Sequence, residues 1–518
     1  MRSRVLLAAL LLALPALPAV TPAATAARPR GCAGTVGGVD LQRATVLDLQ
    51  RAMASRRLTS ADLVRMYQAR IATFDKGPGE LNSVRALNPR ALADAKARDA
   101  ERRRGYVRGP LHGIPVLLKD NVGTKDMPTT AGSIALAGSV PKNDAYVTAK
   151  LRKAGAVILG KTNLSEFANW VDLNMPNGYS SLGGQVVNPY NGGDPSGSSS
   201  GSGVAGTMAF AAVTIGSETS GSILSPSDAN SLVGLKPTLG LVKTDGIIPL
   251  APSFDVPGPM TRNVTDAAAV LNAITERPPP GATTVQRTDY LRGLRTTALK
   301  GVRLGVPSAD NRPSGERGKV FDAAIAALKK AGAVVVETDV LGAAGVPSLS
   351  ELGLIPNEFK WSLNEYLATE ARPKTGVKTL ADIVAYNDKH KDKVRYGQRL
   401  LVASDATPGN GVLAEASAAP VRAQAQAAIE AALRADDLDA IVELGPANAN
   451  VGAAAGYPTV IVPAGYTSGG LNPVGLAFTG TALSEASLLA YAYAYEQATR
   501  KRVPPTSFGR DLFPASCR

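Results

Sequence analysis

Histidine and cysteine are almost missing from this sequence of 518 residues, which contains two of each. Any reaction that depends on a histidine base therefore has two candidates, His112 and His390. The two cysteines, Cys32 and Cys517, stand near opposite ends of the sequence and lack the short spacing of metal ligands. Because no cluster of cysteine and histidine is present, we expect neither a metal nor a cofactor.

Long apolar runs are also scarce, and the one that exists is at the start. Arg2 and Arg4 precede an apolar run over 5–17, and small residues follow up to Ala26. This pattern is typical of a secretory signal peptide over 1–26. The run is too short for a membrane anchor, and no later segment offers the roughly 18 apolar residues that a span requires. We therefore expect a secreted protein, cleaved near Ala26, with no membrane partner.

The expected secretion affects whether the two cysteines form a disulfide bond. In an oxidising compartment we expect Cys32 and Cys517 to pair and to join the two ends of the chain. The alternative is two unpaired thiols near the termini.

The charge balance is basic, but the charges are mixed. The chain carries 56 Lys and Arg against 43 Asp and Glu, a net charge of +13. The basic residues alternate with acids, as in 97–104, which is typical of solvated helix surfaces. Zinc-finger spacing and the aromatic signature of RNA-binding domains are both missing. We therefore do not expect a nucleic-acid partner.

Helical and strand patterns alternate along the chain. A phrase over 151–158 recurs over 328–336, and in each a helix ends at a glycine before a strand begins. The alternation predicts an α/β fold in one large domain, with a surface excursion at 278–281. Further helices are expected at 46–73, 91–104, 144–154, 421–435 and 484–499, and further strands at 116–119, 156–159, 439–442 and 458–463.

A stretch rich in glycine and serine covers 191–206 and runs into the apolar segment 204–215, after which a second such patch covers 216–223. A flexible linker is the ordinary interpretation of such a composition. Two patches that bracket a buried segment instead indicate backbone that is fixed in the core. Consecutive backbone N–H groups in such a turn can bind an oxyanion.

Two local patterns match known motifs but lack the secondary structure that those motifs require. Residues 155–162 fit the phosphate-loop pattern, but the residues between the glycines are themselves the expected strand. Ser139 and Lys142 fit the S-x-x-K pattern, but the proline between them favours a loop over the required helix. We expect neither nucleotide binding nor penicillin-type chemistry.

Gly197–Gly201 also fits the nucleophile elbow, G-x-S-x-G, with Ser199 as nucleophile. That fold requires a histidine downstream, where the one candidate, His390, stands in a highly charged segment. A serine hydrolase with this sequence more plausibly uses a buried lysine, since desolvation lowers the pKa of lysine. Lys119, which ends an apolar strand, is a candidate, although a lysine in that place is usually exposed.

Five phrases of the sequence resemble the amidase signature family in their order along the chain. They are 110–121, 160–167, 197–203, 216–223 and 234–238, within a core of about 110–262. Within the family, 126–132 and 197–203 are most similar to secreted bacterial peptide amidases. The resemblance implies one amidase domain over 27–518, built on a twisted mixed β-sheet that helices cover on both faces.

The resemblance also implies roles for individual residues. Ser222 corresponds to the nucleophile and Lys119 to the base. Alignment without gaps makes Ser198 the bridging serine, preceded by a cis peptide bond, and Ser199 its supporting hydrogen-bonder; a gap of one residue would transfer the bridging role to Ser199. The oxyanion hole corresponds to the backbone N–H groups of Thr219, Ser220, Gly221 and Ser222.

The implied activity is hydrolysis of carboxylic amides through a Ser-Ser-Lys relay and an acyl-enzyme. C-terminal amides of peptides and aryl or alkyl acyl amides are the two expected substrate classes. Leu224 stands where many members have arginine, Ser227 where alanine is common, and Glu218 and Ser220 where aspartate and glycine are commoner, so the substrate remains open. The alternatives are a histidine-dependent esterase that uses Ser199 and a non-catalytic binding protein on the same scaffold.

The family also includes subunits of tRNA-dependent amidotransferases, which work with a cytosolic partner and tRNA. The expected signal peptide argues against that role here. The sequence leaves the oligomeric state open.

Overall fold

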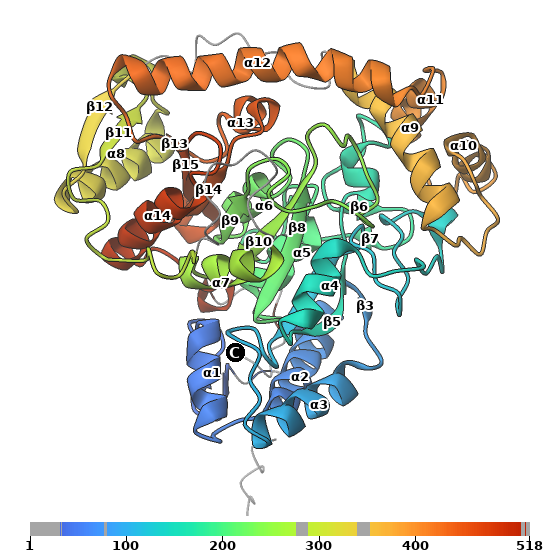
Figure 1. The fold of residues 1–518 in the computed structure, drawn as a ribbon, viewed down its shortest axis with the longest axis horizontal. Helices are drawn as coiled ribbons and strands as arrows, with labels where there is room; N and C mark the ends of the chain where they lie inside the picture. Colours follow the sequence, from blue (N-terminus) through green and yellow to red (C-terminus); the bar gives the residue numbers. More distant parts are fainter. Residues whose placement is uncertain are drawn as a thin grey trace, which may run out of the picture.

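The computed structural model describes residues 34–76, 80–275, 289–338 and 353–508, together with Cys32 and Phe513. An eleven-stranded sheet runs through these residues with helices along it (Figure 1). From one edge to the other its strands are β12 (Val334–Glu337), β11 (Arg303–Val306), β13 (Ala440–Leu444), β15 (Asn472–Thr479), β14 (Thr459–Thr467), β9 (Val233–Lys236), β10 (Val256–Thr261), β8 (Val213–Glu218), β4 (Pro115–Lys119), β5 (Val157–Thr162) and β3 (Val84–Leu87).

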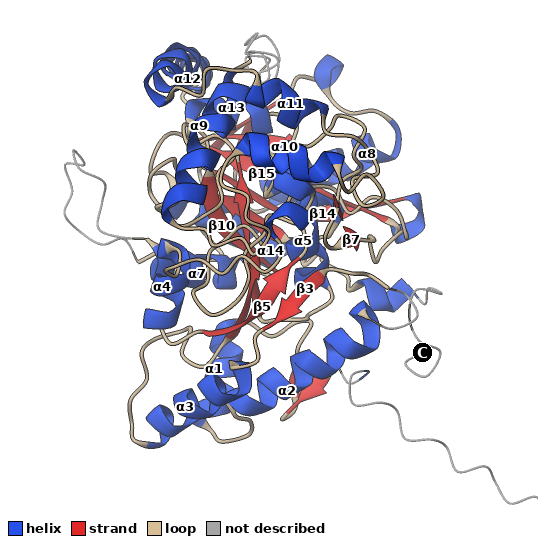
Figure 2. Cartoon of the chain, turned by 90° about the vertical axis from the view of Figure 1, so that its right-hand side faces the viewer, coloured by secondary structure: helices blue, strands red, loops and turns tan. Residues whose placement is uncertain are grey.

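Two short hairpins lie outside this sheet, β1 (Thr35–Val36) with β2 (Val39–Asp40) and β6 (Tyr179–Ser180) with β7 (Gly184–Gln185). The α-helices are α1 (Val46–Ala54), α2 (Ser60–Arg70), α3 (Ala91–Arg103), α4 (Tyr146–Lys153), α5 (Ser200–Thr207), α6 (Leu224–Ala229), α7 (Val264–Ile274), α8 (Gly315–Lys330), α9 (Leu354–Thr369), α10 (Leu380–Asp388), α11 (Arg399–Asp405), α12 (Gly411–Ala435), α13 (Ala449–Ala455) and α14 (Glu485–Thr499). Helices α1, α2 and α3 lie together at one end of the molecule, and α12 crosses the opposite end (Figures 1 and 2).

The sheet is mixed. Strand β4 pairs in parallel with β5 and β8, and β11 pairs in parallel with β12 and β13. The strands between these two groups pair antiparallel, as do β3 and β5 at the far edge. The predicted α/β class and single large domain on a mixed sheet are thus confirmed.

Alternate residues of one strand face two different cores, because side chains along a strand point to opposite faces of the sheet. In β13, Val442 and Leu444 belong to the larger apolar cluster, together with Phe321 of α8. Their neighbour Ile441 belongs to a second cluster, together with Ala432 of α12. Helices therefore cover both faces of the sheet.

Most predicted elements are present, with shifted ends. The helix–glycine–strand phrases are confirmed, with φ of +86° at Gly155 and +96° at Gly332, a region that favours glycine. The pattern over 46–73 gives two helices, because Thr59 caps the start of a new one through a reciprocal capping box with Asp62. Helix α12 begins ten residues before the expected 421, at Gly411, and contains Pro420.

Several predictions fall on residues outside the described ranges. They are the signal peptide over 1–26, the surface excursion at 278–281, and Cys517. Cys32 takes part in a disulfide bond, and Cys517 is the other cysteine of the sequence. Over the described ranges, no helix has the length and apolar character of a membrane span.

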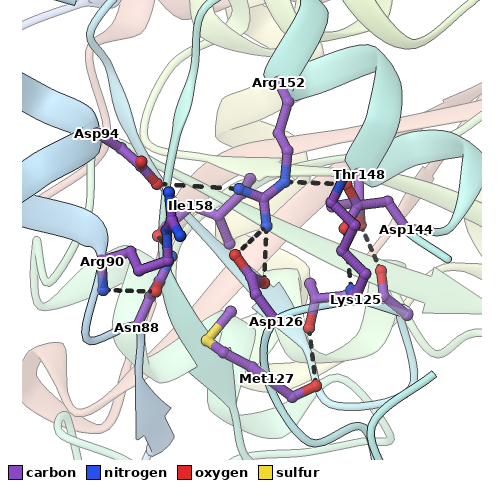
Figure 3. Close-up of polar contacts among 12 residues, drawn as sticks. Asn88, Arg90, Asp94, Lys125, Asp126, Met127, Asp144, Thr148, Arg152 and Ile158 are labelled. Atoms are coloured by element: carbon purple, nitrogen blue, oxygen red, sulfur yellow. Dashed lines mark hydrogen bonds and ion pairs between the residues drawn. The ribbon is translucent and has the colours of Figure 1, made fainter. Parts of the chain in front are cut away.

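Arg152 fixes the long connection between β4 and α4, which begins directly after Lys119. From the last turn of α4, its guanidinium donates to both carboxylate oxygens of Asp126 at 2.8 Å. It also lies 3.1 Å from Asp144 and 3.9 Å from Asp94 of α3 (Figure 3). Both ends of the connection are therefore tied to α4 and to the N-terminal helices.

Candidate active site

Lys119 is the last residue of β4, a strand that lies between β5 and β8 in the interior of the sheet. Its side chain is fully buried. The ammonium nitrogen Nζ donates to Ser198 Oγ at 2.8 Å, to Ser217 Oγ at 3.0 Å and to the Ser217 carbonyl at 3.1 Å. The expectation that an exposed position is commoner for such a lysine does not hold here.

Burial controls the protonation of this lysine. Desolvation lowers the pKa of Lys119 to about 7, against the opposing negative charges of Asp255 and Glu218, which raise it. The side chain makes no direct contact with either carboxylate among the described residues. A substantial fraction of Lys119 is therefore a neutral amine near neutral pH, and a neutral amine can accept a proton.

The first glycine- and serine-rich patch is packed in the core. Ser198, Ser199 and Ser200 are all fully buried, and the last of them begins α5. A Cβ atom at Gly216 of β8 would lie 2.9 Å from the Ser199 hydroxyl, so glycine lets the two segments approach closely. The prediction of fixed backbone is confirmed, and the linker interpretation is wrong.

The structure distinguishes the roles of Ser198 and Ser199, which the alignment left open. The peptide bond between Gly197 and Ser198 is cis, and Ser198 is the serine that contacts Lys119. The Ser199 hydroxyl instead donates to the Ser217 carbonyl at 3.0 Å and accepts from the Ser217 N–H at 3.2 Å. The Ser199 N–H also donates to the Ser222 carbonyl at 3.2 Å. Ser199 thus connects β8 to the loop of Ser222.

That loop leaves β8 at Glu218 and returns into α6. The buried carboxylate of Glu218 accepts the N–H groups of Ile223 at 2.7 Å and Leu224 at 3.0 Å, which closes the loop on itself. Gly221 has a φ of +80°, which glycine adopts without a steric penalty.

The closed loop exposes unpaired backbone donors. Within the described part of the chain, no hydrogen bond is made by the N–H groups of residues 219–222. The Ser222 hydroxyl likewise makes no hydrogen bond to a described residue, and the Ser222 side chain is nearly buried. Unpaired N–H groups beside a free hydroxyl form an arrangement that can accept a developing oxyanion.

Sequence reasoning missed three polar residues of the site. Asn121 donates to Ser217 Oγ at 2.9 Å, so the amide holds the hydroxyl that Lys119 also contacts. Asp255 accepts the Thr219 hydroxyl at 2.5 Å, and the N–H groups of Leu250 and Ala251 hold its other oxygen. Asn121 and Ser217 stand inside the recognised phrases, whereas no local sequence pattern singles out Asp255.

A cavity lies against this cluster. The polar residues of its wall are Asn121, Ser217, Thr219, Thr244 and Asp255, and the remaining lining is apolar, including Phe167 and Ile248. An apolar pocket with a few convergent polar groups is the usual form of a small-molecule site.

The competing candidates lie elsewhere. His112 is buried against the carbonyl of Arg98, and His390 stacks on Tyr386 after α10, so neither contacts Ser199. Residues 157–162 are strand β5, which excludes a free phosphate loop, and Ser139–Lys142 form no helix. No group of three or more metal-binding side chains is present in the described ranges.

Comparison with known proteins finds matches that cover most of this chain. A family model described as Amidase matches residues 62–489. A probable amidase of Arabidopsis thaliana is 40% identical over 483 residues, which cover 90% of this chain and 92% of the relative. Native peptide amidase from Stenotrophomonas maltophilia has 43% identity and a TM-score of 0.82, over 89% of this chain and 98% of that one. The peptide amidase PAM in complex with the competitive inhibitor chymostatin has the same identity and TM-score, over 89% and 99%.

Proposed function

Because this chain belongs to the amidase family and is a hydrolase of amide C–N bonds, we propose that it acts through a relay of Ser222, Ser198 and Lys119. One observation carries this proposal. The fully buried Lys119 donates to Ser198 Oγ at 2.8 Å, and burial lowers the pKa of Lys119 to about 7. A lysine that is neutral near physiological pH and in contact with a serine is suited to general-base catalysis.

The proposed reaction begins with two proton transfers. Neutral Lys119 takes the Ser198 hydroxyl proton, and Ser198 takes the proton of Ser222 as Ser222 Oγ attacks the amide carbonyl carbon. The tetrahedral intermediate carries its negative charge on the former carbonyl oxygen. The unpaired N–H groups of residues 219–222 would donate hydrogen bonds to that oxygen, and the loss of one such donor typically costs about 10²–10³-fold in rate.

The relay then runs in reverse. Protonated Lys119 returns its proton through Ser198 to the leaving nitrogen, and the C–N bond breaks to release the amine and an acyl-enzyme on Ser222. Protonation of the leaving amine is what makes an amide bond breakable under mild conditions. Water attacks the acyl-enzyme by the same path and releases the carboxylic acid.

We propose C-terminal amides of peptides as the first substrate class, and aryl or alkyl acyl amides as the second. The similarity to two peptide amidase structures supports the first class. The apolar lining of the cavity beside Thr219 suits a hydrophobic side chain in either class.

We also propose that the protein is secreted, with a signal peptide over 1–26. The leader pattern supports this proposal, as does the disulfide bond at Cys32, because disulfides persist in oxidising compartments.

Two measurements test the proposed function. The purified protein is incubated with peptide amides of varied C-terminal residue, and ammonia release is followed. In parallel, a fluorophosphonate labels the reactive serine and mass spectrometry locates it. We expect ammonia release and a label on Ser222. A label on Ser199 would support the esterase alternative, and a folded protein that neither takes a label nor releases ammonia would support the binding protein.

A further inference from the structure

A second cavity, of about 190 Å³, lies at the other end of the sheet from β4 and β5. It is lined where three strands end: Val306 is the last residue of β11, Thr338 follows β12, and Leu444 is the last residue of β13. It shares no lining residue with the cavity beside Lys119. The two cavities are therefore separate sites.

The order of the strands at this cavity is typical of a ligand-binding crevice. From β11 the chain passes through α8 to β12 on one side, and β13 lies on the opposite side of β11. All three strands are parallel, so their carboxyl ends meet at one edge (Figure 1). In open α/β sheets, the crevice outside the carboxyl ends of strands at such a switch of direction is where ligands bind.

Helices close the crevice from both faces of the sheet. Phe321 of α8 lines the cavity from the face of the larger apolar cluster. Ala432, near the end of α12, lines it from the face of the second cluster. Most of the lining is apolar, so the cavity suits a hydrophobic body of small size.

Glu443 is the acidic group in this lining. The residue is 7% exposed, and one of its carboxylate oxygens accepts a hydrogen bond from the side-chain amide of Asn448. The backbone N–H of Asn448 also acts on this carboxyl group. Burial raises the pKa of Glu443 to about 7, and no charged neighbour contributes to this shift.

The basic side chains near the cavity do not neutralise Glu443. Arg312 donates to the carbonyl of Pro307 at 2.9 Å and pairs with Glu337 at 2.7 Å. Arg317 lies beside Gly445, where its charge acts on Asp228. The Thr338 hydroxyl, also in the lining, is buried and has no hydrogen-bond partner among the described residues. Within the described part of the chain, the cavity thus presents one carboxyl group without a cationic partner and one hydroxyl without a hydrogen-bond partner.

We propose that this cavity binds a small organic ammonium ion with an apolar body, with Glu443 as its counter-ion. An ammonium group carries up to three N–H donors, which suit the Glu443 carboxylate and the Thr338 hydroxyl. A divalent metal needs more oxygen ligands than one carboxylate supplies. An anion would be repelled by Glu443 and has no unpaired cation among the lining residues.

The test uses phenethylammonium as the probe and the neutral 2-phenylethanol as its isostere. Each is titrated by calorimetry into the full-length protein at pH 8, where Glu443 is ionised, after a fluorophosphonate has blocked the catalytic serine. We expect a dissociation constant of about 1 mM for the ammonium, as for other ligands of this size. We expect about tenfold weaker binding of the alcohol, because it lacks the charge. Equal binding of both probes, or no saturable binding of the ammonium, would overturn the proposal.

Two variants with the same chemical change locate the site. Glu443→Gln should weaken ammonium binding by about tenfold, whereas Glu415→Gln, which removes an exposed carboxylate of α12 outside the lining, should leave it unchanged. Full binding by Glu443→Gln would overturn the proposal.

If Glu443→Gln does not fold, a pH series of ammonium binding to the unmodified protein replaces the variant. Affinity should fall as pH is lowered from 8 to 6, because Glu443 becomes protonated. Affinity that is unchanged over this range would contradict the assignment.

Binding that disappears when the catalytic serine is blocked would assign the probe to the first cavity and overturn the proposal. If the fluorophosphonate does not label the protein, the proposed function fails, and the unblocked titration still tests this site.

Discussion

Neighbouring strands β4 and β5 each carry a fully buried lysine near the carboxyl end, and the surroundings of the two lysines differ in kind. In the parallel register Leu118 pairs with Lys161, and Lys119 pairs with Thr162. Successive side chains of a strand point to opposite faces, so the two lysines serve opposite sides of the sheet. Lys119 faces the serine-rich loops, and Lys161 faces the connection that follows β4.

The contacts of Lys161 are those of a structural cation. Its Nζ donates to the Val122 carbonyl at 2.6 Å and to Thr129 Oγ1 at 2.7 Å, and it lies 3.8 Å from a carboxylate oxygen of Asp120. Burial lowers the pKa of Lys161 to about 8 and that of Lys119 to about 7. Because burial lowers both pKa values, burial does not identify the base; the contact with Ser198 does.

The largest difference is expected in catalysis. Lys119→Met should lower kcat/KM for an amide substrate by about 10²–10⁴-fold, the usual contribution of a general base. Lys161→Met, the matched change on β5, should stay within about tenfold of the unmodified protein. Circular dichroism establishes that both variants are folded before the assay. Equal losses in the two folded variants would show that burial, and not the Ser198 contact, is what matters.

Stability should show the opposite order. Lys161→Met leaves Asp120 buried without its lysine, which should lower the free energy of unfolding by about 3–5 kcal/mol. Lys119→Met removes no paired cation and should change it by about 1 kcal/mol. Urea denaturation measures both. Adding Asp120→Asn to Lys161→Met should recover much of the loss, and the absence of any recovery would refute the ion pair.

Ser217 sharpens the comparison at one further contact of Lys119. Its hydroxyl accepts hydrogen bonds from both Lys119 and Asn121, so Ser217→Ala should lower kcat by about tenfold, because Lys119 loses one of its hydrogen bonds. Thr129→Val removes the corresponding hydroxyl partner of Lys161 and should leave kcat unchanged. Steady-state kinetics on the two variants compares them, and a larger loss in Thr129→Val would contradict the assignment.

The smallest effect is expected from Asp255, a positioning residue near the base. Its negative charge raises the pKa of Lys119, so Asp255→Asn should lower that pKa further. The acid limb of kcat/KM should then move to lower pH, because neutral Lys119 persists in more acidic solution. Asparagine can still contact Thr219 and the backbone N–H groups. A limb that stays in place, or moves to higher pH, would show that Asp255 does not act through Lys119.

The alternating patterns were sufficient to predict the α/β class, the helix–glycine–strand phrases and the buried serine-rich patch. Each of these depends on local periodicity and on the conformational freedom of glycine. The break between α1 and α2 depends on the capping box at Thr59, which apolar periodicity overlooks. The cavity at β11, β12 and β13 depends on strand order, which no local pattern contains.

The residues of the site were harder to predict. The sequence pattern could not show that Lys119 is buried, and burial alone does not distinguish it, because Lys161 and Lys236 are also buried. Their roles differ because of contacts between distant segments. For the same reason the sequence left the roles of Ser198 and Ser199 open, since contacts with β4 and β8 distinguish the two hydroxyl groups. Asp255 reaches the site through the pairing of β10 with β8.

The rate at which a fluorophosphonate labels Ser222, measured from pH 5.5 to 8.5 and mapped by mass spectrometry, tests the central claim most directly. With Lys119 as base, the rate constant should rise about tenfold per pH unit below about 7 and level off above it, because only neutral lysine accepts the proton. Lys161→Met should keep that profile, and Lys119→Met should lose both the rate and its midpoint. A flat profile in the unmodified protein, or a midpoint that moves with Lys161→Met, would contradict the account.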